Sequence, residues 1–227
     1  MIVIGITGSI GMGKSTAADM LREMGIPVHD ADAAVHALLA PGGGGVSAVG
    51  NKFPEALKSD ASGIPYIDRP ALGRVVFSDR SKKKELEGIL HPLVRADSAR
   101  FIAEMKQQGR RIAALDVPLL FETGGEKRVD VVLCVSASKE LQQKRVLARP
   151  GMTLEKFNLV VAEQMPDAEK RRRASFVVET DNGLDDTRRQ LKMIVDKILP
   201  PACAKPGLRS GEGRPPAPPS SAPPYAP

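Results

Sequence analysis

The chain has 227 residues, which is enough for one substantial α/β domain, and 42% of them are hydrophobic, as in an ordinary globular core. Tryptophan is absent and aromatic residues make up 4%, so the composition argues against the stacking platforms that single-stranded nucleic-acid binders use. The net charge of +6 suits polyanions, and because the basic residues are scattered among acids it favours small anionic substrates over nucleic acid.

The two cysteines and the N-terminal sequence indicate a cellular compartment. Cys134 lies in an apolar run and Cys203 in a proline-rich tail, so no disulfide framework is expected and a reducing compartment is favoured. No leader-like segment opens the chain, and no run approaches the roughly 20 apolar residues of a membrane helix. We therefore expect a cytoplasmic protein without a membrane partner, with a monomer as the favoured oligomeric state.

The first predicted element is a short buried strand that leads into a glycine-rich loop. The apolar run 2–6 precedes Gly-Ser-Ile-Gly-Met-Gly-Lys-Ser-Thr at residues 8–16, which matches the P-loop pattern G-x-x-x-x-G-K-[ST]. A helix is predicted over 14–24, and Gly25 ends it. Because strand, loop and helix occur in the required order, a chance glycine-rich turn is a poor explanation.

Each residue type in this loop has a physical task. Gly8, Gly11 and Gly13 are expected to adopt φ values that side chains disfavour, so that successive main-chain N–H groups point at one anion. The helix that follows adds the positive end of its dipole. We expect Lys14 to bridge the β- and γ-phosphates of a nucleotide, and the Ser15 hydroxyl to ligate the accompanying Mg²⁺.

Two acids follow the second predicted strand. This strand, over 27–29, ends at Asp30 and Asp32, on the sheet edge where α/β proteins bind ligands. We expect at least one of these acids to be catalytic. The alternative is that one of them caps a helix over 33–39.

The interval 46–108 is interpreted as a helical insertion, with a turn-rich piece over 59–69 and no strand. One helix is predicted to begin at Asp68-Arg69-Pro70 and another at His91-Pro92. An insertion of this size between the second and third strands is where a phosphotransferase would build its acceptor site.

The third predicted strand, over 112–116, ends at Asp116. An apolar strand that ends in Asp is the Walker B pattern, which positions Mg²⁺ through a carboxylate. A fourth strand is predicted over 129–135 and a fifth over 176–178, followed by an amphipathic helix over 184–199.

A basic helical segment between the last two strands is interpreted as a lid that closes over ATP. Its first helix is predicted to begin near Lys139 and to end at Pro150. Two further helices are predicted over about 152–164 and 166–173. Arg145 and Arg149 are four residues apart, so they are expected to share a helical face, and Arg149 is expected to contact ATP in the closed state.

These elements predict an α/β fold of the P-loop kinase type, with three layers, a five-stranded parallel sheet, a helical acceptor-binding insertion and a helical lid. The kinase domain would span 1–199. Its core would comprise about 1–40, 110–137 and 174–199, its insertion about 46–108 and its lid about 138–173. Residues 200–227 are rich in proline and small residues and are expected to be disordered.

Signatures of other P-loop proteins do not occur. A GTPase would carry Asn-Lys-x-Asp, whereas the similar run at 51–54 is Asn-Lys-Phe-Pro and lacks the acid. The Leu-Ser-Gly-Gly-Gln motif of ABC-type ATPases is absent. A small kinase remains.

An ordered set of motifs resembles the dephospho-CoA kinase family over about residues 1–199. Only the P-loop is decisive alone, but the order of the set is specific. The motifs are Gly8 to Thr16, Asp30-Ala31-Asp32, Pro41-Gly42, Val75-Val76-Phe77, His91-Pro92-Leu93-Val94, Asp116-Val117-Pro118-Leu119-Leu120-Phe121-Glu122 and Gln164.

The resemblance implies that ATP donates its γ-phosphoryl group to the ribose 3′-hydroxyl of dephospho-CoA, giving CoA and ADP in the last step of CoA biosynthesis. It implies that Asp32 is the general base, with Lys14 and Arg145 acting on the transferring phosphoryl group, and that Asp30 orients or helps to hold Mg²⁺. The residues implied to bind ATP phosphates are Gly11, Met12, Gly13, Lys14, Ser15 and Thr16. Those implied on the acceptor side are Asp30, His91, Pro118, Leu119, Leu120 and Glu122.

Two alternatives remain open at this point. The chain could phosphorylate another nucleoside or nucleotide, since such kinases share everything up to the acceptor pocket. It could also be a nucleotide-gated binding or adaptor protein that uses its tail to engage a partner.

Overall fold

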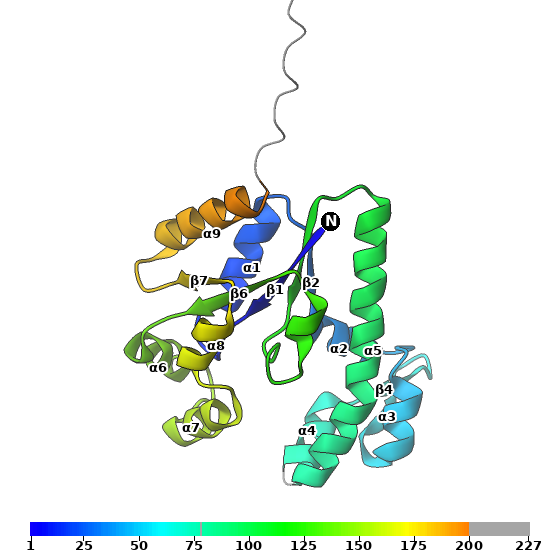
Figure 1. The fold of residues 1–227 in the computed structure, drawn as a ribbon. Helices are drawn as coiled ribbons and strands as arrows, with labels where there is room; N and C mark the ends of the chain where they lie inside the picture. The colour runs from blue at the N-terminus through cyan, green and yellow to red at the C-terminus, as the bar shows by residue number, and fades with distance from the viewer. Residues whose placement is uncertain (78, 200–227) are drawn as a thin grey trace, which may run out of the picture.

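The structure is a computed structural model that describes residues 1–77 and 79–199, and Figure 1 shows a central sheet with helices on both faces. Five parallel strands lie in the order β2-β5-β1-β6-β7, which confirms the predicted sheet. The strands are β1 (Ile2–Thr7), β2 (Val28–Asp30), β5 (Ile112–Asp116), β6 (Val131–Ser136) and β7 (Phe176–Glu179).

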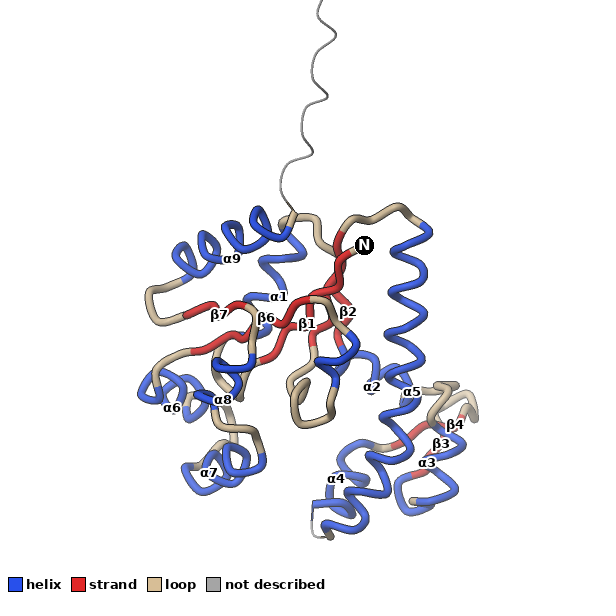
Figure 2. The backbone as a smooth tube through the Cα atoms, viewed as in Figure 1, coloured by secondary structure: helices blue, strands red, loops and turns tan. Residues whose placement is uncertain are grey.

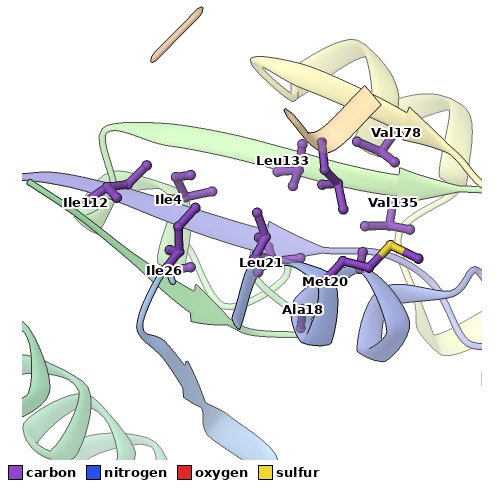
Figure 3. Close-up of a cluster of buried hydrophobic side chains, with 13 residues drawn as sticks. Ile4, Ala18, Met20, Leu21, Ile26, Ile112, Leu133, Val135 and Val178 are labelled. Carbon is purple, nitrogen blue, oxygen red and sulfur yellow. The ribbon is translucent and has the colours of Figure 1, made fainter. Parts of the chain in front are cut away.

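The main hydrophobic core lies between the sheet and two helices, α1 (Lys14–Glu23) and α9 (Leu184–Ile198). Figure 3 shows Ile4 and Leu133 of the strands facing Leu21 of α1. The opposite face is covered by α5 (Arg80–Gln107) and α8 (Asp167–Arg173). Because both faces are covered, the strands are nearly continuous in apolar residues, as parallel strands must be.

The strand register brings the polar strand ends together. Ile6 of β1 lies beside Asp116 of β5, and Asp116 in turn lies beside Asp30 of β2. The P-loop leaves β1 two residues after Ile6. Loop and acids therefore meet at the carboxyl edge of the sheet, where ligands bind in this class of fold.

The segment between β2 and β5 contains a small β-hairpin, so the prediction that 46–108 holds no strand is wrong. Figure 2 shows the hairpin beside α3. Its strands have three residues each and are mostly exposed, and Asp60 closes the turn by accepting hydrogen bonds from the N–H groups of Ser62 and Ile64. The elements here are α2 (Ala31–Leu39), α3 (Val46–Lys52), η1 (Pro54–Ala56), β3 (Leu57–Ser59), β4 (Pro65–Ile67) and α4 (Arg69–Phe77).

Helix α5 runs without a break through Pro92, so the prediction of a new helix beginning at His91-Pro92 is also wrong. Proline removes one backbone hydrogen bond from a helix interior. Pro92 lies on the exposed side of α5, while Leu90 before it and Met105 after it are buried. Packing on both sides of the proline therefore keeps the helix continuous.

Three short helices connect β6 to β7, as predicted: α6 (Lys139–Leu147), α7 (Leu154–Glu163) and α8. Arg145 lies in α6, but Arg149 lies two residues beyond the end of this helix. The prediction that the two arginines share a helical face is therefore wrong.

None of the helices in the described part of the chain combines the length and the apolar character that crossing a membrane requires. The predicted disordered tail, with Cys203, lies outside the described residues.

Candidate active site

The P-loop adopts the backbone geometry that anion binding needs. Gly11 and Gly13 have φ values of 78° and 91°, in the left-handed region that favours glycine. Gly8 does not have a positive φ, so that part of the prediction is wrong. A Cβ at Gly8 would lie 2.6 Å from the Val135 carbonyl oxygen of β6, so glycine is required there by the close approach of the P-loop to β6.

Two glutamines fix the tip of the loop from the lid side. The Gln142 side chain donates to the Ile10 carbonyl (2.8 Å), and the Ile10 N–H donates to Gln164 Oε1 (3.1 Å). Gln164 was noted from the sequence only as part of the family resemblance, and Gln142 was not noted. The contacts join residues more than 130 positions apart in the chain, so no local pattern could have revealed them.

Met12 contributes to the loop through its main chain. Its side chain is buried, with Sδ accepting from the Ala137 N–H at 3.0 Å, and its carbonyl accepts from Thr180 Oγ1 at 3.0 Å. The Met12 side chain therefore packs into the protein, and only its backbone is available to a phosphate.

Arg145 is engaged by protein atoms in this conformation. Its guanidinium donates to the hydroxyl (2.8 Å) and the carbonyl (2.9 Å) of Thr180, and more distantly to the Gly11 carbonyl (3.5 Å). The predicted arginine thus lies beside the P-loop. Arg149 is exposed just past the end of α6.

Lys14 and Asp116 form an ion pair at the base of the site, with Nζ 2.5 Å from Oδ1. Asp116 is 3% exposed. Burial raises the pKa of the Asp116 carboxyl, Lys14 opposes this, and the charges of Asp30 and Asp32 add to the increase. Asp30 and Asp32 therefore lie near enough to Asp116 for their charges to act on it.

The two acids after β2 have different roles in the fold. Asp30 is the N-cap of α2, because its Oδ1 accepts from the N–H groups of Asp32 (2.9 Å) and Ala33 (3.0 Å). The Asp32 side chain is exposed and lines a cavity. The sequence left open whether these acids are catalytic or cap a helix. Asp30 is the capping residue, and this leaves the Asp32 carboxylate available to a ligand.

A cavity of about 1200 Å³ opens next to Asp32, and residues of α4, α5 and α7 contribute to its walls. Leu115 and Val117, the neighbours of Asp116 in the chain, line it, so the cavity begins beside the Lys14–Asp116 pair. Most of the predicted acceptor residues also line it, with the exception of Asp30. They are His91, Pro118, Leu119, Leu120 and Glu122, and Asp32, the predicted base, lines the same cavity.

Glu122 belongs to the cavity wall and also holds the lid segment. Its carboxylate accepts from the Met165 N–H (2.8 Å) and pairs with the ammonium of Lys170 (2.9 Å). The Lys170 side chain is completely buried, and its Nζ also donates to the Pro118 carbonyl (3.3 Å). These contacts join the loop after β5 to α8 and to the Met165 backbone before it.

The oxygen donors near the P-loop fit Mg²⁺ bound together with phosphates. No group of three His, Cys, Asp or Glu side chains within residues 1–77 and 79–199 could hold a metal alone. Mg²⁺ usually takes one or two protein oxygens and fills its octahedron with phosphates and water. The Ser15 hydroxyl at the start of α1 and the Asp116 carboxylate at the end of β5 are such oxygens.

Comparisons with known proteins agree with this geometry. The family model described as dephospho-CoA kinase matches residues 2–186. A dephospho-CoA kinase of Mesorhizobium japonicum is 50% identical over 200 residues, which cover 87% of this chain and 97% of that protein. One from Paramagnetospirillum magneticum is 55% identical over 171 residues, which cover 75% of this chain and 78% of that protein.

Solved structures give the same answer. A crystal structure of a Thermus thermophilus protein matches with a TM-score of 0.71 and 39% identity, covering 87% of this chain and 97% of that one. Dephospho-CoA kinase from Campylobacter jejuni matches with a TM-score of 0.65 and 27% identity, covering 86% and 96%. With a P-loop, a carboxylate-rich strand edge and a neighbouring cavity all in place, matches over this much of the sequence show that the chain belongs to the dephospho-CoA kinase family.

Proposed function

We propose that this chain transfers the γ-phosphoryl group of ATP to the ribose 3′-hydroxyl of dephospho-CoA, giving CoA and ADP. The observation that carries the proposal is the position of Asp32. Its carboxylate lines a cavity large enough for an extended acceptor, beside the Lys14–Asp116 pair of a P-loop. An acceptor hydroxyl in that cavity would lie between a base and a bound triphosphate.

In this proposal Asp32 accepts the proton of the attacking hydroxyl. The backbone amides between Gly8 and Thr16 hold the phosphates, and Lys14 turns from Asp116 toward the β- and γ-phosphates when ATP binds. Ser15 and Asp116 would hold Mg²⁺, which would neutralise negative charge on the phosphates. Positioning and positive charge account for most of the rate enhancement in phosphoryl transfer.

The lid arginines have proposed roles that require movement. Arg145 would exchange its bonds to Thr180 for the transferring phosphoryl group, and Arg149 would approach ATP as the segment 138–173 closes. The exposure of Arg149 and the position of Arg145 beside the P-loop support this proposal.

The remaining partners follow from the sequence. The proposed substrates are ATP and dephospho-CoA, without a nucleic-acid or membrane partner, and the proposed state is a cytoplasmic monomer. The scattered basic residues support the first point, and the buried, unpaired thiol of Cys134 supports a reducing compartment.

An acceptor panel tests the proposal. Purified protein with ATP and Mg²⁺ is offered dephospho-CoA, nucleosides and nucleoside monophosphates, and ADP release is measured for each. We expect the value of kcat/KM for dephospho-CoA to exceed the others by at least about 10³-fold, because a large pocket is built for the whole acceptor. A monophosphate that matched or exceeded it would make the chain another nucleotide kinase.

A further inference from the structure

Three arginines line the acceptor cavity, and two of them, Arg95 and Arg128, lie close enough to act on each other. Arg95 lies on α5, one helical turn after His91, and Arg128 is the last residue of η2 (Gly125–Arg128). Partial burial lowers the pKa of the Arg128 guanidinium, and the positive charge of Arg95 lowers it further. Two guanidinium groups that line one cavity therefore repel each other.

No carboxylate in the described part of the chain forms an ion pair with either guanidinium. Three glutamates line the same cavity, but Glu122 is paired with Lys170 and Glu163 with Lys83. Glu87 lies eight residues before Arg95, roughly 12 Å along α5. Because no described carboxylate offsets the repulsion between the two arginines, a ligand that binds beside them should be an anion.

The phosphates of ATP do not meet this requirement. The P-loop that would hold them spans residues 8–16, and none of these residues lines the cavity. Asp32, the proposed base, does line it. An anion at the two arginines would therefore belong to the molecule that presents its hydroxyl to Asp32.

Dephospho-CoA carries such an anion on the same ribose whose 3′-hydroxyl is phosphorylated, since its 5′-oxygen bears a diphosphate. Guanidinium groups match phosphate oxygens through two parallel hydrogen bonds. We propose that Arg95 and Arg128 bind this diphosphate from two sides and so orient the ribose with its 3′-hydroxyl toward Asp32. This inference rests on the proposed function and names the residues that recognise the acceptor.

The cavity volume agrees with an acceptor of this length. About 1200 Å³ is more than the roughly 300–1000 Å³ of a usual small-molecule site. Beyond the arginines the wall toward α4 and α5 includes Val76, Leu86 and Leu90, which suit the uncharged arm that follows the diphosphate.

Kinetics of Arg95→Gln and Arg128→Gln test the inference, with Arg110→Gln as the matched control. Arg110 is exposed between α5 and β5, at the opposite edge of the sheet from the site, so its loss removes the same charge without touching the cavity. We expect each cavity variant to raise the KM for dephospho-CoA roughly 10- to 100-fold and to lower kcat, because the ribose is then less well oriented toward Asp32, with the KM for ATP within about twofold of wild type. The Lys variants at both positions should recover part of this loss because they keep the charge.

Neither arginine side chain forms an ion pair or hydrogen bond with a residue that the structure describes, so circular dichroism and thermal melting should match wild type. If the KM for dephospho-CoA stays within twofold of the Arg110→Gln value in both variants, the inference is overturned. An equal rise in the KM for ATP also overturns it, because the arginines would then serve the donor. Wild-type protein that fails to phosphorylate dephospho-CoA would instead remove the proposed function itself, so the two failures are distinct.

Discussion

Asp30 and Asp32 are separated by one residue, and their side chains meet different demands. Asp30 accepts two main-chain hydrogen bonds at the start of α2, whereas Asp32 points its carboxylate into the cavity. A cap tolerates Asn as well as Asp, but a general base does not. The same substitution at the two positions should therefore have different results.

We expect Asp32→Asn to lower kcat by about 10²- to 10⁴-fold with an unchanged melting temperature, because the carboxylate accepts the hydroxyl proton and is exposed, with no hydrogen bond to a described residue. Asp30→Asn is the matched control and should retain both the fold and most of the activity. The measurement is steady-state ADP release together with thermal melting. Near-normal turnover of Asp32→Asn would show that another group, or water, takes the proton.

Individual residues could be predicted where their roles follow from local backbone chemistry. Gly11, Gly13 and Lys14 were identified because the P-loop is a continuous run whose geometry depends on its own residues. Gln142 and Thr180 support the same loop from distant helices and strands, and only the tertiary fold brings them there. The residues of the loop itself were therefore easier to predict from the sequence than the residues that hold the loop in place.

At the scale of elements, the Glu122–Lys170 pair connects the loop after β5 with α8. Breaking a buried ion pair by removing one partner leaves a charge without compensation. Lys170 is completely buried, while Glu122 retains some exposure and a second bond to the Met165 N–H. Loss of Glu122 should therefore destabilise the protein more than loss of the Lys170 charge.

We expect Glu122→Gln to lower the free energy of unfolding by about 3–5 kcal/mol, and Lys170→Met, which fills the same space without a charge, to cost clearly less. The double variant should be more stable than Glu122→Gln alone, because it removes the stranded ammonium. Urea denaturation of all three proteins measures these values. Equal losses in the two single variants, or simple additivity in the double variant, would contradict the asymmetry.

The elements that sequence reasoning missed have a common physical cause. Strands β3 and β4 are too short and too exposed to show an alternating pattern. Pro92 is a strong local signal for a helix start, but packing of α5 on both sides overrides it. The five core strands were found because burial on both faces leaves a long apolar run in the sequence.

At the scale of the whole molecule, every residue assigned to the site precedes residue 186, where the family match ends. We therefore expect a chain truncated after Leu199 to keep the full kcat and both KM values of the kinase reaction. Activity assays on truncated and full-length protein, with ATP binding measured in parallel, test this. Loss of function with intact ATP binding would instead favour the adaptor alternative, in which residues 200–227 engage a partner.

The position of β1 also determines when the sheet can form during synthesis. Residues 2–6 leave the ribosome before residues 112–116, with which they pair, and the whole insertion is translated in between. At roughly 5–20 residues per second this takes several seconds, during which an apolar strand has both edges unpaired. The insertion, whose contacts are mostly local, is free to fold meanwhile, so the nascent kinase should acquire its acceptor-side helices before its nucleotide site and should depend on chaperones in that interval.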